Sequence, residues 1–212
     1  MAKAGRGQII VTRQSDRATD TAATPGPDSL IAAAKQAQKA GKLPPVDQWN
    51  PPFCGDLDME IKRDGTWFYE GTPIGRKPLV RLFSTILKRE GDAYFLVTPV
   101  EKVGIRVEDA PFVAVDFETA GAGRAQVITF TTNVGDTVIA GPDHAIRVLR
   151  GGDGEPSPYV HIRAGLEALI DRKSFYRLVD VGEAHRVDGT DWFGVWSQGT
   201  FFRIIPIAEL DL

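Results

Sequence analysis

Residues 56–69, Asp-Leu-Asp-Met-Glu-Ile-Lys-Arg-Asp-Gly-Thr-Trp-Phe-Tyr, carry the clearest structural pattern of the chain. Leu57, Met59 and Ile61 alternate with acidic residues, which is typical of a β-strand that buries one face. The polar residues 63–66 contain a Gly and predict a hairpin turn. The aromatic residues 67–69 then predict the returning strand, so this stretch indicates antiparallel pairing.

The same reasoning extends in both directions along the chain. Residues 12–27 contain no large apolar side chain and predict a flexible linker, which is followed by a helix over residues 30–40. Pro78 is expected to begin an amphipathic helix that ends at Gly91. A second predicted helix runs from about residue 164 to 171. Further strands are predicted at 94–97, 104–107, 112–115, 127–130, 137–139, 144–149, 159–162, 175–180, 192–196 and 201–205. Turns are predicted at 133–136 and 151–154.

Two spaced patterns occur in both halves of the chain. The pattern Arg76-x-x-Leu-x-x-Leu-Phe matches Arg163-x-x-Leu-x-x-Leu-Ile, and Tyr94-x-Leu-Val-x-x-x-Glu matches Tyr176-x-Leu-Val-x-x-x-Glu. These matches predict an α+β fold made of two repeated units, each with antiparallel strands packed on one helix. The predicted division is a flexible basic arm at 1–27, a first unit with its leading helix at 28–116, and a second unit at 117–212. Two unrelated units with ordinary core spacing remain the alternative.

Charge argues against nucleic acid as a partner of the folded part. The chain has a formal net charge of −3. Residues 1–41 contain more Lys and Arg than Asp and Glu, so the remainder is more acidic than the whole chain. Surfaces that bind nucleic acid normally cluster positive charge to neutralise phosphates. We therefore expect no nucleic-acid binding by the body of the protein.

The sequence also bears on compartment. Cys54 is the single cysteine, follows Pro-Pro-Phe, and is expected to be a buried thiol in a reducing compartment. No apolar run has the length that a membrane span requires. The N-terminal residues lack the apolar core of a secretory signal. These observations predict a cytoplasmic protein without a membrane span.

Motifs of common catalytic and cofactor sites are absent from the sequence. The Gly-Ala-Gly of residues 121–123 lacks the third Gly and the following helix of a dinucleotide loop. The three His residues have no metal-site spacing. We expect no cofactor and no resident metal, and whether the protein is an enzyme is left open. Asp56, Asp58 and Glu60 on one strand face could bind Mg²⁺ for phosphoryl chemistry, or could simply form the solvated face of that strand.

Other residues point to the binding of an anion. Arg76 and Arg163 are each predicted in the first turn of a helix, where a guanidinium and unpaired backbone N–H groups together attract negative charge. An ion pair with a local carboxylate, Glu101 or Glu183, is the competing interpretation. The segments Trp49-Asn50 and Trp196-Ser197 offer aromatic rings for stacking beside hydrogen-bonding groups, although Trp is often a core residue.

Several segments together resemble a known bacterial family. They are 45–51 (PVDQWNP), 54–61 (CGDLDMEI), 95–102 (FLVTPVEK), 107–112 (VEDAPF), 165–170 (GLEALI), 175–179 (FYRLV) and 194–199 (GVWSQG). In these segments the chain is similar to the domain-of-unknown-function family DUF1285, from about Leu30 to Ile205. The resemblance implies a duplicated α+β core whose second half is superficially pleckstrin-homology-like. It also implies a pocket between the halves, a nucleotide-like ligand and a role in signalling, and it supplies no catalytic residues.

The leading hypothesis is a sensor or adaptor that binds an anionic, nucleotide-like small molecule between the two units. Clefts between domains are favoured ligand sites. The alternatives are an enzyme that acts on a phosphorylated small molecule through the carboxylates of residues 56–60, and a protein-interaction scaffold without a ligand. The residues assigned to the ligand site are Trp49, Asn50, Arg76, Thr98, Glu101, Lys102, Arg163, Arg177 and Trp196.

Overall fold

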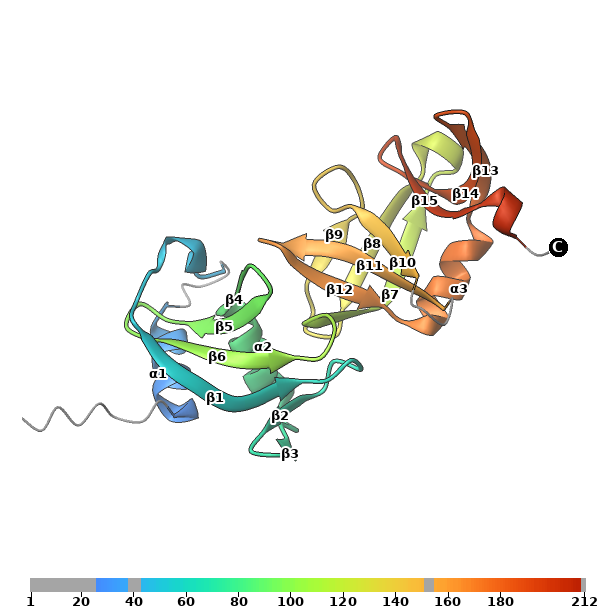
Figure 1. The fold of residues 1–212 in the computed structure, drawn as a ribbon. Helices are drawn as coiled ribbons and strands as arrows, with labels where there is room; N and C mark the ends of the chain where they lie inside the picture. The colour runs from blue at the N-terminus through green and yellow to red at the C-terminus, as the bar shows by residue number, and fades with distance from the viewer. Residues whose placement is uncertain (1–25, 38–42, 151–154, 211–212) are drawn as a thin grey trace, which may run out of the picture.

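Two six-stranded sheets dominate the fold of this protein (Figure 1). The computed structural model describes residues 26–37, 43–150 and 155–210 of the 212-residue chain. A third sheet of three strands and three α-helices complete the described part. The predicted arm at 1–27 lies almost wholly outside the described residues, as does the turn expected at 151–154. Among the described helices, none has the length and apolar character needed to cross a membrane.

The first sheet is built by the N-terminal half of the chain. Its strands are β1 (Phe53–Ile61), β2 (Trp67–Tyr69), β3 (Thr72–Pro73), β4 (Leu87–Glu90), β5 (Ala93–Val97) and β6 (Lys102–Val107). Their order is β3-β2-β1-β6-β5-β4. The central pair, β1 and β6, is parallel, and the other pairs are antiparallel. Helices α1 (Pro27–Ala37) and α2 (Lys77–Thr85) pack against each other in this half, with the 3₁₀ turn η1 (Val46–Gln48) between α1 and β1.

The second sheet repeats this arrangement. Its strands are β7 (Phe112–Ala120), β8 (Val127–Thr132), β9 (Thr137–Ile139), β10 (Ile146–Arg150), β11 (Pro156–Arg163) and β12 (Leu166–Ile170). The order β9-β8-β7-β12-β11-β10 is the order of the first sheet with each strand replaced by the one six places later. Its central pair, β7 and β12, is again parallel. The repeated unit is therefore confirmed as a topology, with one parallel pair in each sheet instead of antiparallel strands throughout.

The C-terminal segment adds a layer that the first unit lacks. It consists of α3 (Arg172–Asp180), β13 (Glu183–Val187), β14 (Thr190–Ser197) and β15 (Thr200–Pro206), with the short turns η2 (Gly123–Ala125) and η3 (Ile207–Glu209) beside β14. The Ser197 hydroxyl donates to the Ala140 carbonyl at 2.6 Å and accepts from the Ile128 N–H at 3.0 Å. The end of β14 is thus tied to the second sheet.

The first predicted hairpin is confirmed. Leu57, Met59 and Ile61 of β1 are buried, and the intervening acidic residues are exposed or half-buried. In the turn, the Asp64 carboxylate accepts the Thr66 N–H at 2.8 Å, and Gly65 has a φ of +81° that only Gly adopts without strain. The local sequence therefore specifies both the turn and the strand alternation.

The helix that was predicted to begin at Pro78 does not extend to Gly91, so its predicted end is wrong. Helix α2 ends at Thr85, and residues 87–90 form β4, which pairs with β5 across a turn that contains Gly91. The Ser84 and Thr85 hydroxyls donate to carbonyls three residues earlier, at 2.8 and 2.7 Å, which competes with continued α-helix. Pairing with β5 then decides in favour of a strand.

The predicted order of helix and strand after residue 163 is also wrong. Residues 166–170 form strand β12, in which Leu166, Ala168 and Ile170 are buried alternately, and residues 172–180 form helix α3. The Asp171 carboxylate accepts the Ser174 N–H at 2.7 Å and so caps the start of α3. A segment of five residues is too short to show whether its apolar residues follow the period of a helix or that of a strand. The Asp171 cap is the local sequence feature that marks where the helix begins.

These corrections change how the two units correspond. Arg76 precedes a helix, whereas Arg163 ends a strand. Residues 94–97 form a strand, whereas residues 176–179 lie in a helix. Neither of the two sequence matches therefore joins equivalent positions of the two units. Topology instead relates β1 to β7 and β6 to β12. Residues 112–116, which we assigned to the first unit, lie in β7 and pair with the second sheet.

Candidate functional site

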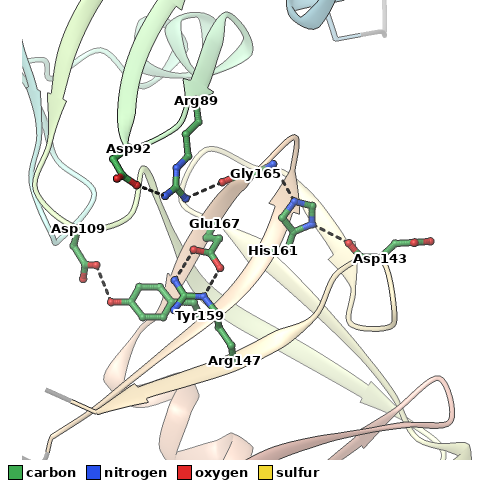
Figure 2. Close-up of polar contacts among 9 residues, drawn as sticks. All are labelled: Arg89, Asp92, Asp109, Asp143, Arg147, Tyr159, His161, Gly165 and Glu167. Atoms are coloured by element: carbon green, nitrogen blue, oxygen red, sulfur yellow. Dashed lines mark hydrogen bonds and ion pairs between the residues drawn. The ribbon is translucent and has the colours of Figure 1, made fainter.

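The two units meet along a seam that is held by polar contacts. Figure 2 shows Arg89 of the first sheet donating to the Gly165 carbonyl of the second at 3.3 Å. In the same view the Tyr159 hydroxyl donates to Asp109, in the segment that connects the sheets, at 2.7 Å. Burial is the largest cause of the raised pKa of Tyr159, and its bond to the Asp109 carboxylate adds to it. The phenol therefore stays protonated and continues to donate.

The contacts in Figure 2 also join neighbouring strands of the second sheet beside the seam. Arg147 forms a two-pronged ion pair with Glu167, at 2.5 and 2.6 Å, and stacks on the Tyr159 ring. Hydrogen bonding to Glu167 raises the pKa of the Arg147 guanidinium. His161 contacts the Asp143 carbonyl through Nδ1 and accepts the Gly165 N–H at Nε2. Each of these groups is already engaged within the protein.

Arg163 also belongs to the seam, as a structural tie. It forms an ion pair with Asp136 and donates to the Ser84 carbonyl of α2 at 2.8 Å. Its guanidinium lies 4.9 Å from the centre of the Phe112 ring. The prediction that Arg163 lies at a helix start is wrong, because Arg163 ends strand β11, and its charge is compensated by Asp136. It connects the second sheet to the helix of the first unit.

Two tight turns approach each other at the seam. The Asn133 side chain, in the β8–β9 turn, donates to the Gly65 carbonyl of the β1–β2 turn at 3.3 Å and accepts the Val113 N–H at 3.1 Å. A Cβ at Gly65 would lie 2.5 Å from the Asn133 amide nitrogen and 2.9 Å from Val113. Only Gly fits here, both for its positive φ and for this contact.

Beside these turns lies a cleft of about 780 Å³, which we call the seam cleft. It is bordered by the β1–β2 turn, the start of α2, β7 and the β8–β9 turn. Its lining residues are Gly65, Thr66, Trp67, Ile74, Gly75, Lys77, Pro78, Val80, Arg81, Val115, Thr132, Asn133, Val134 and Gly135. A cleft between the units therefore exists, in the size range of small-molecule sites.

The charge of the seam cleft is positive. Lys77 and Arg81 lie one helical turn apart on α2, are exposed, and form no ion pair with any described residue. No acidic side chain is among the described residues that line the cleft. The Arg81 guanidinium lies against Gly135 of the other unit, since a Cβ there would meet its Nη1 at 3.6 Å. Nearby Asp136 is neutralised by Arg163.

Trp67 lines the cleft and carries a buried donor that the described residues leave unpaired. Its side chain is 1% exposed and stacks on Phe83 at a centroid distance of 6.2 Å. Its indole Nε1–H has no acceptor among the described residues. A buried N–H without an acceptor is costly, so groups of this kind often mark a position that a water or a ligand completes.

Arg76 does not line the seam cleft. It is the N-cap residue of α2, makes no side-chain cap, and faces a hollow between α1 and α2. Trp49 and Asn50 follow η1, where Trp49 packs partly on the core and Asn50 is exposed. Neither side chain lines the cleft.

The Thr98-to-Lys102 segment forms a turn and an ion-pair network. Thr98 is buried, and its hydroxyl accepts the Glu101 N–H at 3.2 Å. Glu101 accepts from Ser29 of α1 at 3.4 Å. Lys102 pairs with Glu90 at 3.0 Å over the Phe95 ring, and the lysines around Glu90, Lys102 first, hold its pKa below the ordinary value. These residues join α1 and the β5–β6 turn and lie away from the seam cleft.

Arg177 and Trp196 belong to the C-terminal layer. Arg177 of α3 pairs with Asp116, and this contact is the largest cause of the lowered pKa of Asp116. Arg177 also donates to the Phe117 carbonyl at 2.9 Å. Trp196 of β14 is buried and donates to Glu183 at 2.7 Å. The structure thus distributes the nine predicted site residues over several places, and none of the nine lines the seam cleft.

The carboxylates of β1 lie on its outer face. Asp58 pairs with Arg106 at 2.8 Å, and Glu60 with Lys62 at 3.0 Å. Within the described ranges, no three His, Cys, Asp or Glu side chains gather as a metal ion would need. Cys54, at the start of β1, is exposed, so the expectation of a buried thiol is wrong.

Sequence reasoning missed Lys77, Arg81, Asn133 and Trp67 as a group. Both turns, at 63–66 and 133–136, were predicted correctly as turns. Nothing in their local sequence shows that turns from different units meet, because that contact is made only by the packing of two sheets. The only available sequence feature was the pair of cations one turn apart at the start of α2.

Comparisons with known proteins agree with this architecture. The model of the DUF1285 N-terminal domain, a domain of unknown function, matches residues 44–110. That of the C-terminal domain, from a protein of unknown function, matches residues 111–204. The search of curated proteins found no match.

Two solved structures are similar to the chain. A DUF1285 family protein from Silicibacter pomeroyi DSS-3 is 61% identical, with a TM-score of 0.78, over 86% of this chain and 98% of that one. Another from Shewanella baltica OS155 is 32% identical over 58% of this chain and 91% of that one, with a TM-score of 0.47. On the family models and the first of these structures, the chain belongs to the DUF1285 family.

Proposed function

We propose that this protein binds an anionic, nucleotide-like small molecule in the seam cleft and acts as a sensor or adaptor. The observation that carries the proposal is the pair Lys77 and Arg81, two cations without a described counter-charge in a cleft that has no acidic lining residue. An anion placed there gains charge-assisted hydrogen bonds that the free protein does not satisfy. The cytoplasmic setting and a signalling role remain part of the proposal.

The remaining wall suits a ligand that is partly apolar. Ile74, Val80, Val115 and Val134 supply aliphatic surface, and Asn133 supplies an amide beside the cations. A ligand with a phosphate or carboxylate at one end and a ring at the other matches this distribution. The pleckstrin-homology-like character of the second half stays a prediction.

A thermal-shift screen against nucleotides, signalling dinucleotides and sugar phosphates tests the proposal on the full chain. A ligand at one hundred times its Kd stabilises the folded state by about 2.7 kcal/mol. We expect Arg81→Glu to weaken any hit at least about tenfold, since reversing one charge removes a contact and adds a repulsion.

The matched control is Lys173→Glu, which reverses an exposed cation on α3 away from the cleft. Equal responses of wild type, Arg81→Glu and Lys173→Glu would reject the seam cleft as the site. Absence of any hit would instead favour the scaffold alternative, and turnover of a phosphoester would favour the enzyme.

A further inference from the structure

A second hollow lies between α1 and α2, on the other side of the start of α2 from the seam cleft. Its volume is about 700 Å³, and we call it the helix hollow. It is lined by Ile31, Lys35, Gly75, Arg76, Lys77, Pro78, Leu79 and Leu82. The described residues that form it come from the two helices and the segment that leads into α2, without any residue of the second unit.

The floor of the helix hollow is apolar. Ile31 comes from α1, and Leu79 and Leu82 lie three residues apart on one face of α2. Leu82 is buried, while Ile31 and Leu79 are only partly buried although they pack on the core. The partly exposed side chains leave apolar surface in the hollow that a ligand could cover.

The rim of the helix hollow is cationic. Lys35, Arg76 and Lys77 are all exposed, and none of them forms an ion pair with a described residue. The part of the chain that the structure describes places no acidic side chain in the lining of the hollow. Asp28, at the start of α1, lies near Tyr69 instead and contributes to the raised pKa of that phenol, whose largest cause is burial. The positive charge of the rim is therefore uncompensated by its neighbours among the described residues.

We propose that the helix hollow binds a free single-chain amphiphile with an anionic head, of the fatty-acid class. The apolar floor takes the hydrocarbon chain, and Arg76 and Lys35 take the carboxylate. The volume is in the range of sites for single small molecules. The two hollows share Lys77 at their common edge, but only the seam cleft uses Arg81 and the second unit, and only the helix hollow uses Arg76 and Lys35, so the two proposals are tested separately.

Calorimetric titration of the full chain with dodecanoate, below its micelle concentration, tests the proposal. We expect saturable binding of one equivalent. Dodecyltrimethylammonium, with the same chain and a cationic head, is expected to bind at least about tenfold more weakly, because the rim repels it. Acetate, with the same head and no chain, is expected to produce no measurable heat, because the apolar contact is lost.

Variants separate this site from the seam cleft. Arg76→Glu and Lys35→Glu should each weaken dodecanoate about tenfold, and Ile31→Ser should weaken it without changing the preference for an anionic head. Arg81→Glu, which reverses a cation of the seam cleft, should leave dodecanoate binding unchanged. Because all the charge reversals are at exposed positions, unchanged melting temperatures will show that folding is intact.

Three results would overturn the assignment. One is equal binding of the anionic and cationic amphiphiles, which would indicate non-specific hydrophobic association. Another is loss of dodecanoate binding in Arg81→Glu but not in Arg76→Glu, which would place the amphiphile in the seam cleft. The third is binding to anionic phospholipid vesicles without binding to monomeric dodecanoate, which would indicate a membrane-surface interaction.

Discussion

The two sheets share one strand order but differ in where they carry a helix. In the first unit, α2 is inserted between the third and fourth strands, β3 and β4. In the second unit the equivalent connection, between β9 and β10, is residues 140–145, which form a short turn closed by Gly141 and His144. The second unit instead places α3 and the three-stranded sheet after its last strand.

This difference determines where unsatisfied chemistry lies. Helix α2 supplies Lys77 and Arg81 to the seam cleft, and Arg76, Leu79 and Leu82 to the helix hollow. On α3, by contrast, Arg177 pairs with Asp116 of the second sheet. The shared strands are thus a scaffold, and the candidate sites lie at the element that distinguishes one unit from the other.

The strongest test of this comparison is Phe83→Ala in α2. Phe83 is fully buried and stacks on Trp67, so its removal should lower the free energy of unfolding by about 3–5 kcal/mol. Urea denaturation followed by circular dichroism measures it. A loss below about 1 kcal/mol would mean that the stability of the first unit does not depend on the packing of its inserted helix α2.

Arg163→Ala tests the tie between the units. It should lower the free energy of unfolding by about 2 kcal/mol, because the Ser84 carbonyl and the Asp136 carboxylate both lose a charged donor while remaining partly buried. A double-mutant cycle with Asp136→Asn should show a coupling of about 1 kcal/mol. Strictly additive effects would show that Asp136, which lies in the same unit as Arg163, does not hold the Arg163 side chain toward the Ser84 carbonyl.

Gly65→Ala sharpens the comparison at the seam itself. Gly65 and Gly71 both have positive φ, at +81° and +71°, so alanine strains each by about 1–2 kcal/mol. A Cβ at Gly71 would meet nothing within 4 Å, whereas at Gly65 it meets Asn133 and Val113 of the other unit. Gly65→Ala should therefore cost about 1 kcal/mol more than Gly71→Ala in the same urea assay. Equal losses in the free energy of unfolding would show that Asn133 and Val113 move aside for the added methyl group at no measurable cost.

The smallest expected effect concerns one carboxylate in each unit. Lys102 and Lys88 lower the pKa of Glu90, and Arg177 and the Phe117 N–H lower that of Asp116. A lowered folded-state pKa means that the stabilisation is present above the unfolded-state value, near 4, and is lost as the pH falls through the folded-state value. Glu90→Gln and Asp116→Asn should each flatten the decline in stability between about pH 5 and pH 3.

Salt provides the control for this last prediction. Both pairs are partly exposed, so screening at high ionic strength should shrink the difference between wild type and each variant. Unchanged pH profiles in both variants at low salt would show that neither carboxylate contributes.

Sequence reasoning succeeded where the information is local. The alternation of β1, the turn around Gly65, the strand β5 and the turn at 133–136 were all predicted, because strand faces and turn residues are specified by neighbours in the chain. It failed at residues 164–180, where a five-residue strand and a capped helix were exchanged. Arg163 was consequently predicted in a helix, although it ends a strand.

The candidate site was less predictable than the fold. The sequence indicated a cleft between two units, and a cleft is present there, but Arg76 faces the helix hollow and Arg177 and Trp196 belong to the C-terminal layer. Arginines that look equivalent in sequence differ because Arg163 has a carboxylate opposite it in space. Ion pairing depends on distances across strands and units, which residue spacing does not contain.

By itself, the sequence determined the family, the two-part organisation and most strands and turns. The family follows from the resemblance of several segments to DUF1285. The strands and turns follow from the period of apolar residues and from backbone preferences, both of which act within a few residues along the chain. The tertiary structure alone decided which turns meet at the seam, which cations are compensated and which side of α2 each residue faces. Those properties arise from contacts between segments far apart in sequence, and such contacts exist only after the two sheets have packed together.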